Sequence, residues 1–348
     1  MKILITVDPE IPVPPIAYGG IERIVDQLIY AYSREGHEVT LVAHPQSSNT
    51  AAVRIISWDR LHSRGYDNVF FNAKKLYRVV REVQPDIIHS FSRLLYQYPV
   101  FFRTSIPVYQ TYQRQISRKS TSLAASIAGN QLAFTCCGAH MIKEHPIADK
   151  CTPIHNFTNI DYFKPAEKAR KHLFYLGRIE DLKGTREAID VALATGKKLI
   201  IAGNIEEDHV HYFEKQVEPH LKNSLIEFVG PVNDSQKLEY LQQAEAFLFP
   251  IKWEEPFGIV MVEAMACGVP VIGFDRGAVP EVVVDGVTGF VVKDVDEMIR
   301  AVKQVEKIDR KAVRDYCVKN FSTRQIASQY LDLFNATLKA HAELQEQQ

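Results

Sequence analysis

Two glutamates eight residues apart, Glu255 and Glu263, are the first candidates for chemistry in this sequence. The apolar run Ile259–Ala266 predicts a short helix that is buried on every side, because the run offers no polar face. Glu263 lies inside this run, and a buried carboxylate is costly unless a cation or hydrogen-bond donors compensate it. We therefore expect Glu263 to have a partner, which is either a cation of the protein or the hydroxyl groups of a ligand.

Glu255 lies in the loop before this predicted helix, which begins around Phe257, Gly258 and Ile259. Backbone N–H groups in the first turn of a helix lack acceptors within the helix, so they bind anions and polar oxygens readily. Gly258 has no side chain and lets a ligand approach the backbone closely. This arrangement predicts a site for a polyhydroxylated ligand that carries negative charge. The alternative is a structural glutamate in a packed helix that follows an ordinary acidic loop.

A second group of charged residues lies in Gly177–Gly184, where a predicted strand passes into a helix. Arg178 offers a planar fork of donors and Lys183 a point charge, and both suit a diphosphate. These cations would stabilise the departure of a nucleoside diphosphate, because negative charge builds up on that leaving group. The alternative is a turn closed by salt bridges to Glu180 and Asp181. The segment is not a P-loop, because Gly184 rather than Ser or Thr follows the lysine.

Strands and helices, which must position these residues, are predicted to alternate along the first half of the chain. Apolar runs predict strands at Lys2–Val7, Glu38–Ala43, Ala52–Ile56, Asp86–Ser90, Val108–Thr111, Gln131–Cys136 and Thr152–His155. Apolar residues at helical spacing predict a helix from Ile21 onward and another at Asn72–Val83. Ala139–Glu144 is predicted to be the start of a further helix. This alternation predicts a parallel sheet covered by helices. Gly19 and Gly20 separate the first strand from the first helix, where a phosphate is commonly bound, although such a pair is often only a turn.

The second half repeats the pattern. Strands are predicted at His172–Leu176, Lys198–Ala202, Ile226–Val229, Ala246–Ile251, Val269–Phe274 and Gly289–Val292, with helices at Thr185–Thr195, Phe213–Leu221, Ser235–Gln243, Ile259–Ala266, Asp296–Glu306, Arg310–Asn320 and Thr323–Lys339. The predicted fold is α/β, with two Rossmann-like, doubly wound domains that face a cleft. We place the domains at residues 1–165 and 166–330, followed by a C-terminal helix and tail, 331–348, that could cross back to the first domain.

Composition restricts the class of protein. The net charge is −1, but the first 165 residues hold 18 Lys or Arg against 13 Asp or Glu, while the remainder is acidic. A basic half suits an anionic membrane or acceptor, or is simply a solvated surface. The acidic half and the lack of an RNA-binding motif argue against nucleic acid. Five cysteines without a CxxC pair, no signal peptide and no long apolar run predict a cytoplasmic protein, with peripheral contact to the inner face of a membrane as an option.

No metal site and no cofactor are predicted. Asp294-Val295-Asp296 resembles an acidic metal motif, but Asp296 precedes a predicted helix with Glu297 in its first turn and suits the N-terminal cap. The histidines show no spacing that is typical of metal ligands.

Taken over nearly its whole length, the chain resembles a retaining glycosyltransferase of family four, also called group 1, with the two-domain GT-B fold. The motifs that carry the resemblance are Gly19–Arg23, Gly36–Thr40, Pro85–His89, Gly177-Arg178, Lys183-Gly184, Glu255–Gly258, Glu263–Val271, Gly277 with Pro280-Glu281, and Asp285–Gly289. The pair of glutamates with its flanking residues is the most specific of these motifs.

The resemblance implies a role for each candidate residue. Glu263 would hold the ribose hydroxyls of a nucleotide, and Glu255 with the N–H groups of Phe257, Gly258 and Ile259 would hold the donor sugar. The diphosphate would lie against Arg178 and Lys183, with Gly19 and Gly20 completing its contacts from the other domain. Backbone groups at Gly203, Pro231 and Val232 would hold the base.

One position departs from the family pattern. Many relatives carry a histidine near the anomeric carbon, where this chain has Gln113 after the strand Val108–Thr111. Glutamine donates hydrogen bonds but cannot become cationic. We expect Gln113 to contact a hydroxyl of the donor sugar or of the acceptor.

The resemblance therefore implies a metal-independent, retaining hexosyltransferase of glycan biosynthesis. Its donor would be a nucleotide-sugar, with UDP as the commonest nucleotide, and its acceptor a sugar, a lipid-linked or a small molecule. A nucleotide-sugar epimerase or hydrolase of the same fold is the alternative enzyme. A non-catalytic nucleotide-sugar-binding protein is the alternative from another class, although such a protein would tend to lose the set Arg178, Lys183, Glu255 and Glu263.

Overall fold

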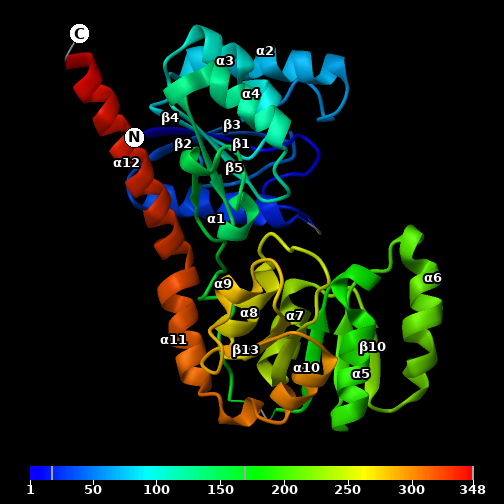
Figure 1. Ribbon diagram of the computed structural model, residues 1–348. Helices are drawn as coiled ribbons and strands as arrows, with labels where there is room; N and C mark the ends of the chain where they lie inside the picture. The colour runs from blue at the N-terminus through cyan, green and yellow to red at the C-terminus, as the bar shows by residue number, and fades with distance from the viewer. Residues whose placement is uncertain (17–18, 168–169, 347–348) are drawn as a thin grey trace. The chain divides into compact units, whose positions relative to one another are not determined.

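The computed structural model describes residues 1–16, 19–167 and 170–346, and it divides into two compact units (Figure 1). Unit 1 comprises Met1–Asn156 together with Thr323–Gln348, and unit 2 comprises Phe157–Ser322. The sequence analysis placed the corresponding boundaries at about residues 165 and 330. Each unit contains its own parallel sheet and its own core, so the prediction of an α/β fold with two Rossmann-like domains is confirmed.

Within the described residues, the sheet of unit 1 has seven strands in the order β3-β2-β1-β4-β5-β6-β7. The strands are β1 (Lys2–Thr6), β2 (Glu38–Ala43), β3 (Arg54–Ser57), β4 (Ile87–Ser90), β5 (Val108–Tyr112), β6 (Leu132–Cys136) and β7 (Cys151–Pro153). All neighbouring strands are parallel. The strand order reverses next to β1, so the loops after β1 and β4 diverge at the carboxyl edge of the sheet, where ligands of such sheets bind.

Helices cover both faces of this sheet. They are α1 (Gly20–Arg34), α2 (Tyr66–Val83), α3 (Tyr98–Arg103), α4 (Arg118–Ala128) and α12 (Thr323–Glu346), with the shorter turns η1 (Leu94–Gln97), η2 (Gly129–Gln131), η3 (Ala139–Ile142) and η4 (Ala148–Lys150). One face packs against α2, α3 and α4, which contribute Leu76, Val100 and Ala124 to a core that also contains Leu4 and Val108. The other face packs against α1 and α12.

Four features of unit 1 differ from the prediction. Helix α2 begins at Tyr66 rather than Asn72, and α3 and α4 were not predicted. The buried side chains of α4 are Thr121 and Ala124, which do not form the apolar period that identifies a helix in sequence. The start predicted at Ala139 is a single tight turn, η3, and α12 continues through His341 to Glu346 instead of ending at Lys339.

A polar group lies inside the core between the sheet and the helices α1 and α12. His89 is fully buried, and its Nδ1 lies 3.3 Å from the Tyr32 hydroxyl while its Nε2 lies 2.9 Å from Thr111 Oγ1. The Tyr330 ring from α12 packs 4.6 Å from the imidazole, centroid to centroid. Burial lowers the pKa of His89 to about 3, so the imidazole is neutral and serves as a hydrogen-bonded part of the core.

The sheet of unit 2 has six parallel strands within the described residues, in the order β10-β9-β8-β11-β12-β13. They are β8 (His172–Leu176), β9 (Leu199–Ala202), β10 (Ile226–Gly230), β11 (Ala244–Phe249), β12 (Val271–Phe274) and β13 (Gly289–Val292). Their helices are α5 (Thr185–Thr195), α6 (Val210–Tyr212), α7 (Asp234–Gln243), α8 (Ile259–Ala266), α9 (Val279–Val282), α10 (Val295–Val302) and α11 (Arg310–Phe321). Shorter turns are η5 (Asp181–Lys183), η6 (Glu207–His209), η7 (Phe213–Val217), η8 (Glu218–Lys222) and η9 (Val305–Lys307).

The main elements of unit 2 agree with the prediction, but α6 and α9 were not predicted, α10 ends at Val302 rather than Glu306, and two further details differ. The segment predicted as a helix at Phe213–Leu221 is helical but irregular: η7 is a π-helix and η8 a 3₁₀-helix, and the change occurs just before Pro219, whose nitrogen cannot donate to a helical carbonyl. Helix α10 begins at Val295, and Asp294 rather than Asp296 caps it through a 2.8 Å bond from the Glu297 N–H.

No helix in the described ranges combines the length and the apolar content needed to span a membrane.

The buried imidazole predicts a pH dependence of the stability of unit 1. The unfolded chain binds a proton at His89 near pH 6.5 and the folded chain only near pH 3, so the free energy of unfolding falls as the pH falls through this window. Between pH 7 and 5 the loss from His89 is about 2 kcal/mol. Urea unfolding can be followed with Trp58 alone in a Trp253→Phe background, because the chain has two tryptophans, one in each unit.

The comparison requires His89→Gln in the same background, because other groups of unit 1 act in the opposite direction. Burial raises the pKa of Asp8, Glu22 and Asp26, so these carboxyls favour the folded state as the pH falls. The difference between parent and variant isolates the imidazole. An equal loss of stability in both proteins between pH 7 and 5 would contradict a neutral His89.

Candidate functional site

The charged and glycine motifs of unit 2 meet at the carboxyl edge of its sheet. Gly177 and Arg178 follow β8, Gly203 follows β9, and the stretch from Trp253 follows β11. The loops after β9 and β10 are joined, because Gly203 N–H donates to Gly230 O over 2.9 Å. Gly203 has a φ of +152°, and a Cβ there would lie 1.8 Å from the Gly177 carbonyl oxygen. Only glycine allows the loops after β8 and β9 to approach this closely.

Lys183 and Glu255, which are 72 positions apart in sequence, form an ion pair through Nζ and Oε2. Trp253 Nε1 donates to the same Glu255 oxygen over 2.9 Å, and Lys183 Nζ lies 4.9 Å from the centroid of the Trp253 ring. The two charged side chains are each 15% exposed. An ammonium and an indole N–H therefore hold the Glu255 carboxylate in one position, while part of the pair remains accessible.

Arg178 is also paired within the chain. Its guanidinium lies 2.9 Å from Glu180 Oε1 and 3.4 Å from Glu206 Oε2, and the side chain is 38% exposed. The alternative of a turn closed by salt bridges therefore holds for Arg178 and Glu180. It does not hold for Lys183, because Asp181 pairs with Lys252 instead.

Helix α8 has the predicted bounds. Gly258 before it adopts a φ of +80°, a conformation that favours glycine, and residues 261–266 of the helix are buried while Ile259 and Val260 are half-buried. No side chain caps the first turn of α8. The backbone N–H groups at such a helix end point away from the helix body. The loop after β12 packs against the glutamate loop, since Ala278 N–H donates to Glu255 O over 3.1 Å.

The partner of Glu263 is a cation of the protein. Lys237 Nζ lies 2.7 Å from Glu263 Oε1, 3.2 Å from Asp234 Oδ1 and 4.8 Å from the centroid of the Phe163 ring. Burial acts to lower the pKa of Lys237, but Glu263 and Asp234 outweigh it, so the pKa is raised and the ammonium stays charged. The burial of Glu263 therefore does not by itself require a ligand. Its other carboxylate oxygen makes no hydrogen bond to the part of the chain that is described.

Sequence reasoning missed Lys237. The residue lies in the first turn of α7, where a lysine ordinarily extends into solvent, and nothing in its local sequence indicates that the side chain is buried. The only signal was indirect, because a carboxylate inside the apolar run Ile259–Ala266 demanded a cation or a ligand.

Pro231 and Val232 directly follow β10 in unit 2, and the remaining predicted residues belong to unit 1. Gly19 precedes α1, and a Cβ there would lie 2.6 Å from Pro15 Cβ and 2.8 Å from Glu22 Oε2, so this turn has no room for a side chain. Gln113 follows β5; its Oε1 accepts a 2.6 Å bond from Asn156 Nδ2, while its Nε2 is buried and has no partner among the described residues.

A charged group that was not predicted includes Arg114, the residue after Gln113. Asp8 follows β1 and accepts a 2.9 Å bond from Arg93 N–H, and its other oxygen lies 3.1 Å from the Arg114 guanidinium. Burial raises the pKa of Asp8, and the nearby Arg114 only partly opposes this. No group of three or more His, Cys, Asp or Glu side chains that could hold a metal ion occurs within the described ranges.

The buried ion pair predicts the effect of removing its cation. Lys237→Met leaves Glu263 as an unpaired charge inside the protein, so it should lower the stability of unit 2 by roughly 3–5 kcal/mol. Hydrogen exchange of peptides from α8 and β11 would report the loss locally. The matched control is the double variant Lys237→Met/Glu263→Gln, which removes both charges and should regain a large part of the loss. Equal destabilisation in both variants would contradict the ion pair as the cause.

Solved structures share this architecture. The glycosyltransferase AviGT4, involved in avilamycin A biosynthesis, superposes with a TM-score of 0.75 at 22% identity, covering 97% of this chain and 98% of that one. HepE of Anabaena, solved in complex with UDP, gives a TM-score of 0.78 at 16% identity and covers 97% of this chain and all of that chain.

Curated relatives include glycogen synthase of Mycobacterium tuberculosis, which is 26% identical over 84% of this chain and 83% of its own length. A phosphatidyl-myo-inositol mannosyltransferase of Mycobacterium leprae is 25% identical over 55% of each chain. Family models cover most of the sequence: the model for glycosyl transferases group 1 matches residues 157–321, and that for glycosyltransferase family 4 matches residues 18–161. The fold and these matches together show that the chain belongs to the group 1 glycosyltransferases of the GT-B fold.

Proposed function

We propose that the protein transfers a hexosyl group from a UDP-sugar to an acceptor hydroxyl, with retained configuration and without a metal ion. The observation that carries this proposal is the Lys183–Glu255–Trp253 group with Arg178 at the carboxyl edge of the unit 2 sheet. It places cations and a fixed carboxylate where ligands of doubly wound sheets bind.

Lys183 and Arg178 hold the donor diphosphate in this proposal. Both cations have carboxylate partners in the chain, and an arriving diphosphate would compete for them with its larger charge. As the sugar–phosphate bond breaks, negative charge moves onto the leaving phosphate. The cations then stabilise the transition state more than the ground state, which is the requirement for catalysis.

The carboxylates hold hydroxyl groups. Glu255, positioned by Trp253, accepts from hydroxyls of the donor sugar, and the N–H groups of Phe257, Gly258 and Ile259 donate to its oxygens. Lys237 keeps Glu263 ionised, and the carboxylate oxygen that Lys237 does not bind accepts from the ribose. The base lies against backbone groups of Gly203, Pro231 and Val232, where the loops after β9 and β10 are hydrogen-bonded to each other.

Unit 1 supplies the acceptor side. Gly19 and Gly20 contribute the N-terminus of α1 to the phosphates, and the unpartnered Nε2 of Gln113 donates to a hydroxyl of the acceptor or of the donor sugar. The acceptor hydroxyl attacks from the face that the phosphate leaves. The departing phosphate oxygen takes the hydroxyl proton, so the protein needs no carboxylate nucleophile and acts by positioning and charge stabilisation.

The choice of UDP draws on solved relatives. HepE of Anabaena was solved with UDP, with UDP-glucose, and with UDP and glucose, whereas starch synthase IV of Arabidopsis thaliana was solved with ADP and acarbose. ADP is therefore the nucleotide whose binding should be compared with that of UDP. We propose that the acceptor is a sugar, a lipid-linked or a small molecule of glycan biosynthesis, and that the enzyme works in the cytoplasm, with the basic first half of the chain near the inner face of a membrane.

The donor site predicts nucleotide binding and its residue dependence. UDP should raise the melting temperature more than ADP or GDP, and a panel of UDP-sugars should include one from which UDP is released. Lys183→Ala and Arg178→Ala should each lower that release about 100-fold or more, because each removes charge stabilisation from the leaving group. Lys303→Ala, an exposed lysine elsewhere in unit 2, is the matched control.

Two further measurements complete this test. Release of UDP in the presence of EDTA should equal release without it, because the cations replace a metal ion. A product with inverted anomeric configuration, or the absence of a melting shift with all three nucleotides, would contradict the proposed reaction.

The proposed contact of Gln113 with a substrate hydroxyl predicts an effect of its replacement on kcat/KM. Gln113→Ala removes one neutral hydrogen bond to a substrate hydroxyl, so kcat/KM should fall about tenfold. Gln115→Ala, two residues away and exposed, should leave kcat/KM unchanged. If both variants turn over at the parental rate, Gln113 does not contact the substrate.

A further inference from the structure

The guanidinium of Arg178 lies between two carboxylates that differ in burial. Glu180, in the same loop, is 4% exposed, whereas the side chain of Glu206, after β9, is 45% exposed. We propose that these two carboxylates have opposite effects on the donor. Glu180, held by His209, positions Arg178 for the diphosphate, and Glu206 occupies the guanidinium until the diphosphate displaces it. These roles rest on the proposed function, in which Arg178 contacts the donor.

Two side chains compensate the buried carboxylate of Glu180. Its Oε1 lies 2.9 Å from Arg178 Nη2, and its Oε2 lies 3.0 Å from His209 Nε2. A carboxylate only accepts, so the facing imidazole nitrogen carries the hydrogen of that contact. Oε1 accepts no hydrogen bond from the described residues, so its contact with the guanidinium is an ion pair without hydrogen-bond alignment. Because a buried carboxylate that loses its cation is costly, Arg178 should keep this contact when a diphosphate binds.

Hydrogen bonds fix the backbone of the loop that carries Arg178 and Glu180. The hydroxyl of the buried Tyr175 lies 3.3 Å from the Arg178 carbonyl oxygen. Ile179 N–H donates to Asn204 O over 3.0 Å and ties this loop to the one after β9. The two loops therefore have a defined relative position before any side chain bridges them, and the contacts of Glu180 extend that order to the guanidinium.

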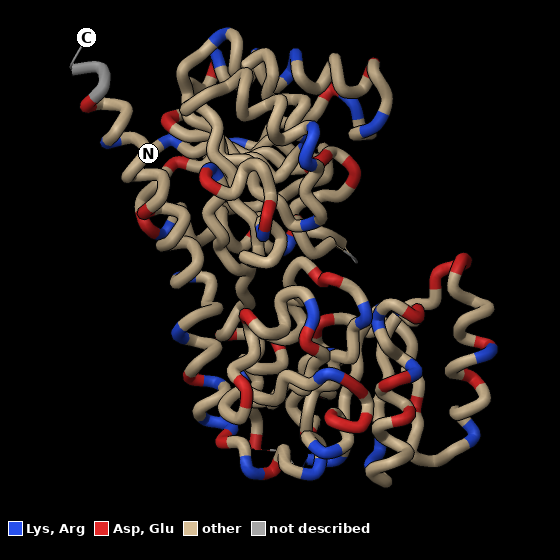
Figure 2. The backbone as a smooth tube through the Cα atoms, in the orientation of Figure 1, with Lys and Arg blue, Asp and Glu red and all other residues tan. Residues whose placement is uncertain are grey.

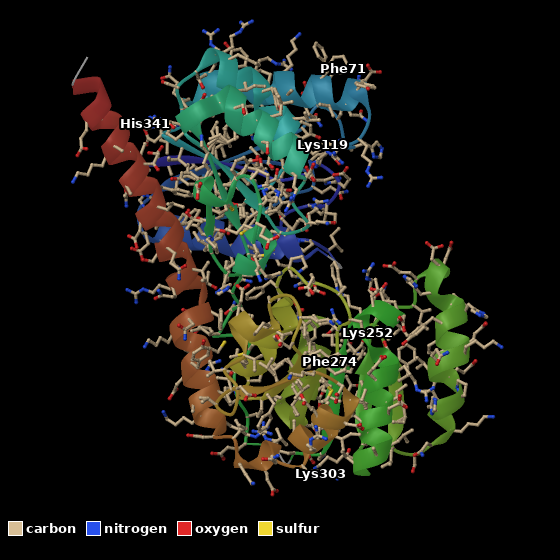
Figure 3. All side chains as sticks on the ribbon, viewed as in Figure 1. Phe71, Lys119, Lys252, Phe274, Lys303 and His341 are labelled. Carbon is tan, nitrogen blue, oxygen red and sulfur yellow. The ribbon has the colours of Figure 1, made fainter. Side chains whose placement is uncertain are left out.

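The next acid along the loop is engaged elsewhere. Asp181 pairs with Lys252, which also lies 2.9 Å from Glu187 and is marked in Figure 3. Glu206 begins the acidic run Glu206–Asp208, which is drawn in red before α6 in Figure 2. Among the described residues, Arg178 therefore has one buried and one exposed carboxylate partner.

The contact with Glu206 is the weaker of the two. Its Oε2 lies 3.4 Å from Arg178 Nη1, and the two side chains are 45% and 38% exposed. Exposed ion pairs contribute little free energy, because water screens the charges and both side chains lose freedom. A diphosphate carries more charge and can accept from the guanidinium through two oxygens at once, so it displaces Glu206. The displaced carboxylate then lies near a ligand of its own sign, and the two repel each other.

Three variants with the same chemical change test these roles by titration calorimetry with UDP. Glu206→Gln should lower the Kd about threefold, the scale of an exposed ion pair. Glu180→Gln should raise the Kd about tenfold, the scale of the coupling between residues in contact. Glu207→Gln, at the exposed residue next to Glu206, should leave the Kd unchanged. All three variants lose one negative charge, so effects of net charge cancel.

The imidazole provides a second comparison. His209→Leu removes the other partner of Glu180, so it should raise the Kd for UDP in the same direction as Glu180→Gln. His211→Leu, on the exposed part of α6, is the matched control and should bind UDP like the parent. Melting curves confirm that each variant folds.

Two measurements separate positioning from a loss of local structure. Uridine has no phosphate, so its affinity, measured by NMR titration, should be equal in Glu180→Gln and the parent. In an Arg178→Ala background, Glu180→Gln should have no further effect on the Kd for UDP, because Glu180 acts through the guanidinium.

The outcomes distinguish these roles from the proposed donor site. If the parent does not bind UDP, or Arg178→Ala binds it equally well, the donor site itself is wrong and the roles of both carboxylates fall with it. If Arg178→Ala weakens binding but Glu180→Gln leaves it unchanged or tightens it, only the positioning role is overturned. Equal weakening of uridine and UDP by Glu180→Gln overturns that role as well.

Discussion

Every strand of unit 2 runs in the same direction, so the loops that follow its strands all emerge at one edge of the sheet. The consequence is that residues from distant parts of the sequence meet there without any local pattern to predict their contacts. Lys183 lies after β8 and Glu255 after β11, and the two strands are neighbours in the sheet. The ion pair between these residues, and the indole N–H that supports it, follow from that parallel pairing. The same constraint brings the glycines after β8, β9 and β10 together.

A second ion pair fixes the helix that carries the site. Lys237 from α7 neutralises Glu263 on α8, and the ring of Phe163 lies close to the same ammonium. This buried pair is best understood as a positioning device, since a buried pair contributes little net stability but is costly to break on one side. It keeps one carboxylate oxygen occupied, and the other makes no hydrogen bond to the residues that the structure describes. The internal cation and a ribose ligand are therefore compatible, although the sequence argument presented them as alternatives.

The two units use buried polar groups differently. In unit 1, His89 is neutral and exchanges hydrogen bonds with hydroxyl groups beneath α1 and α12, so it supports the docking of the last helix on the first sheet. In unit 2, the buried carboxylates Glu180 and Glu263 are paired with cations, Arg178 and Lys237 respectively.

The sequence by itself determined the α/β class, the two repeated halves, the bounds of α8 and the glycine at its start, because these features are encoded in local periodicity and in residues that tolerate unusual backbone angles. It also identified which residues carry charge in the motifs Gly177–Gly184 and Trp253–Gly268. Only the tertiary structure decided how those charges pair. Lys237, Trp253 and Asp8 acquired their contacts through strands and helices that are far apart in sequence. Helix α4 was not predicted, because Thr121 and Ala124 bury too little apolar surface to indicate a helix. Pairing energies depend on distance and burial, and neither quantity can be read from residue order.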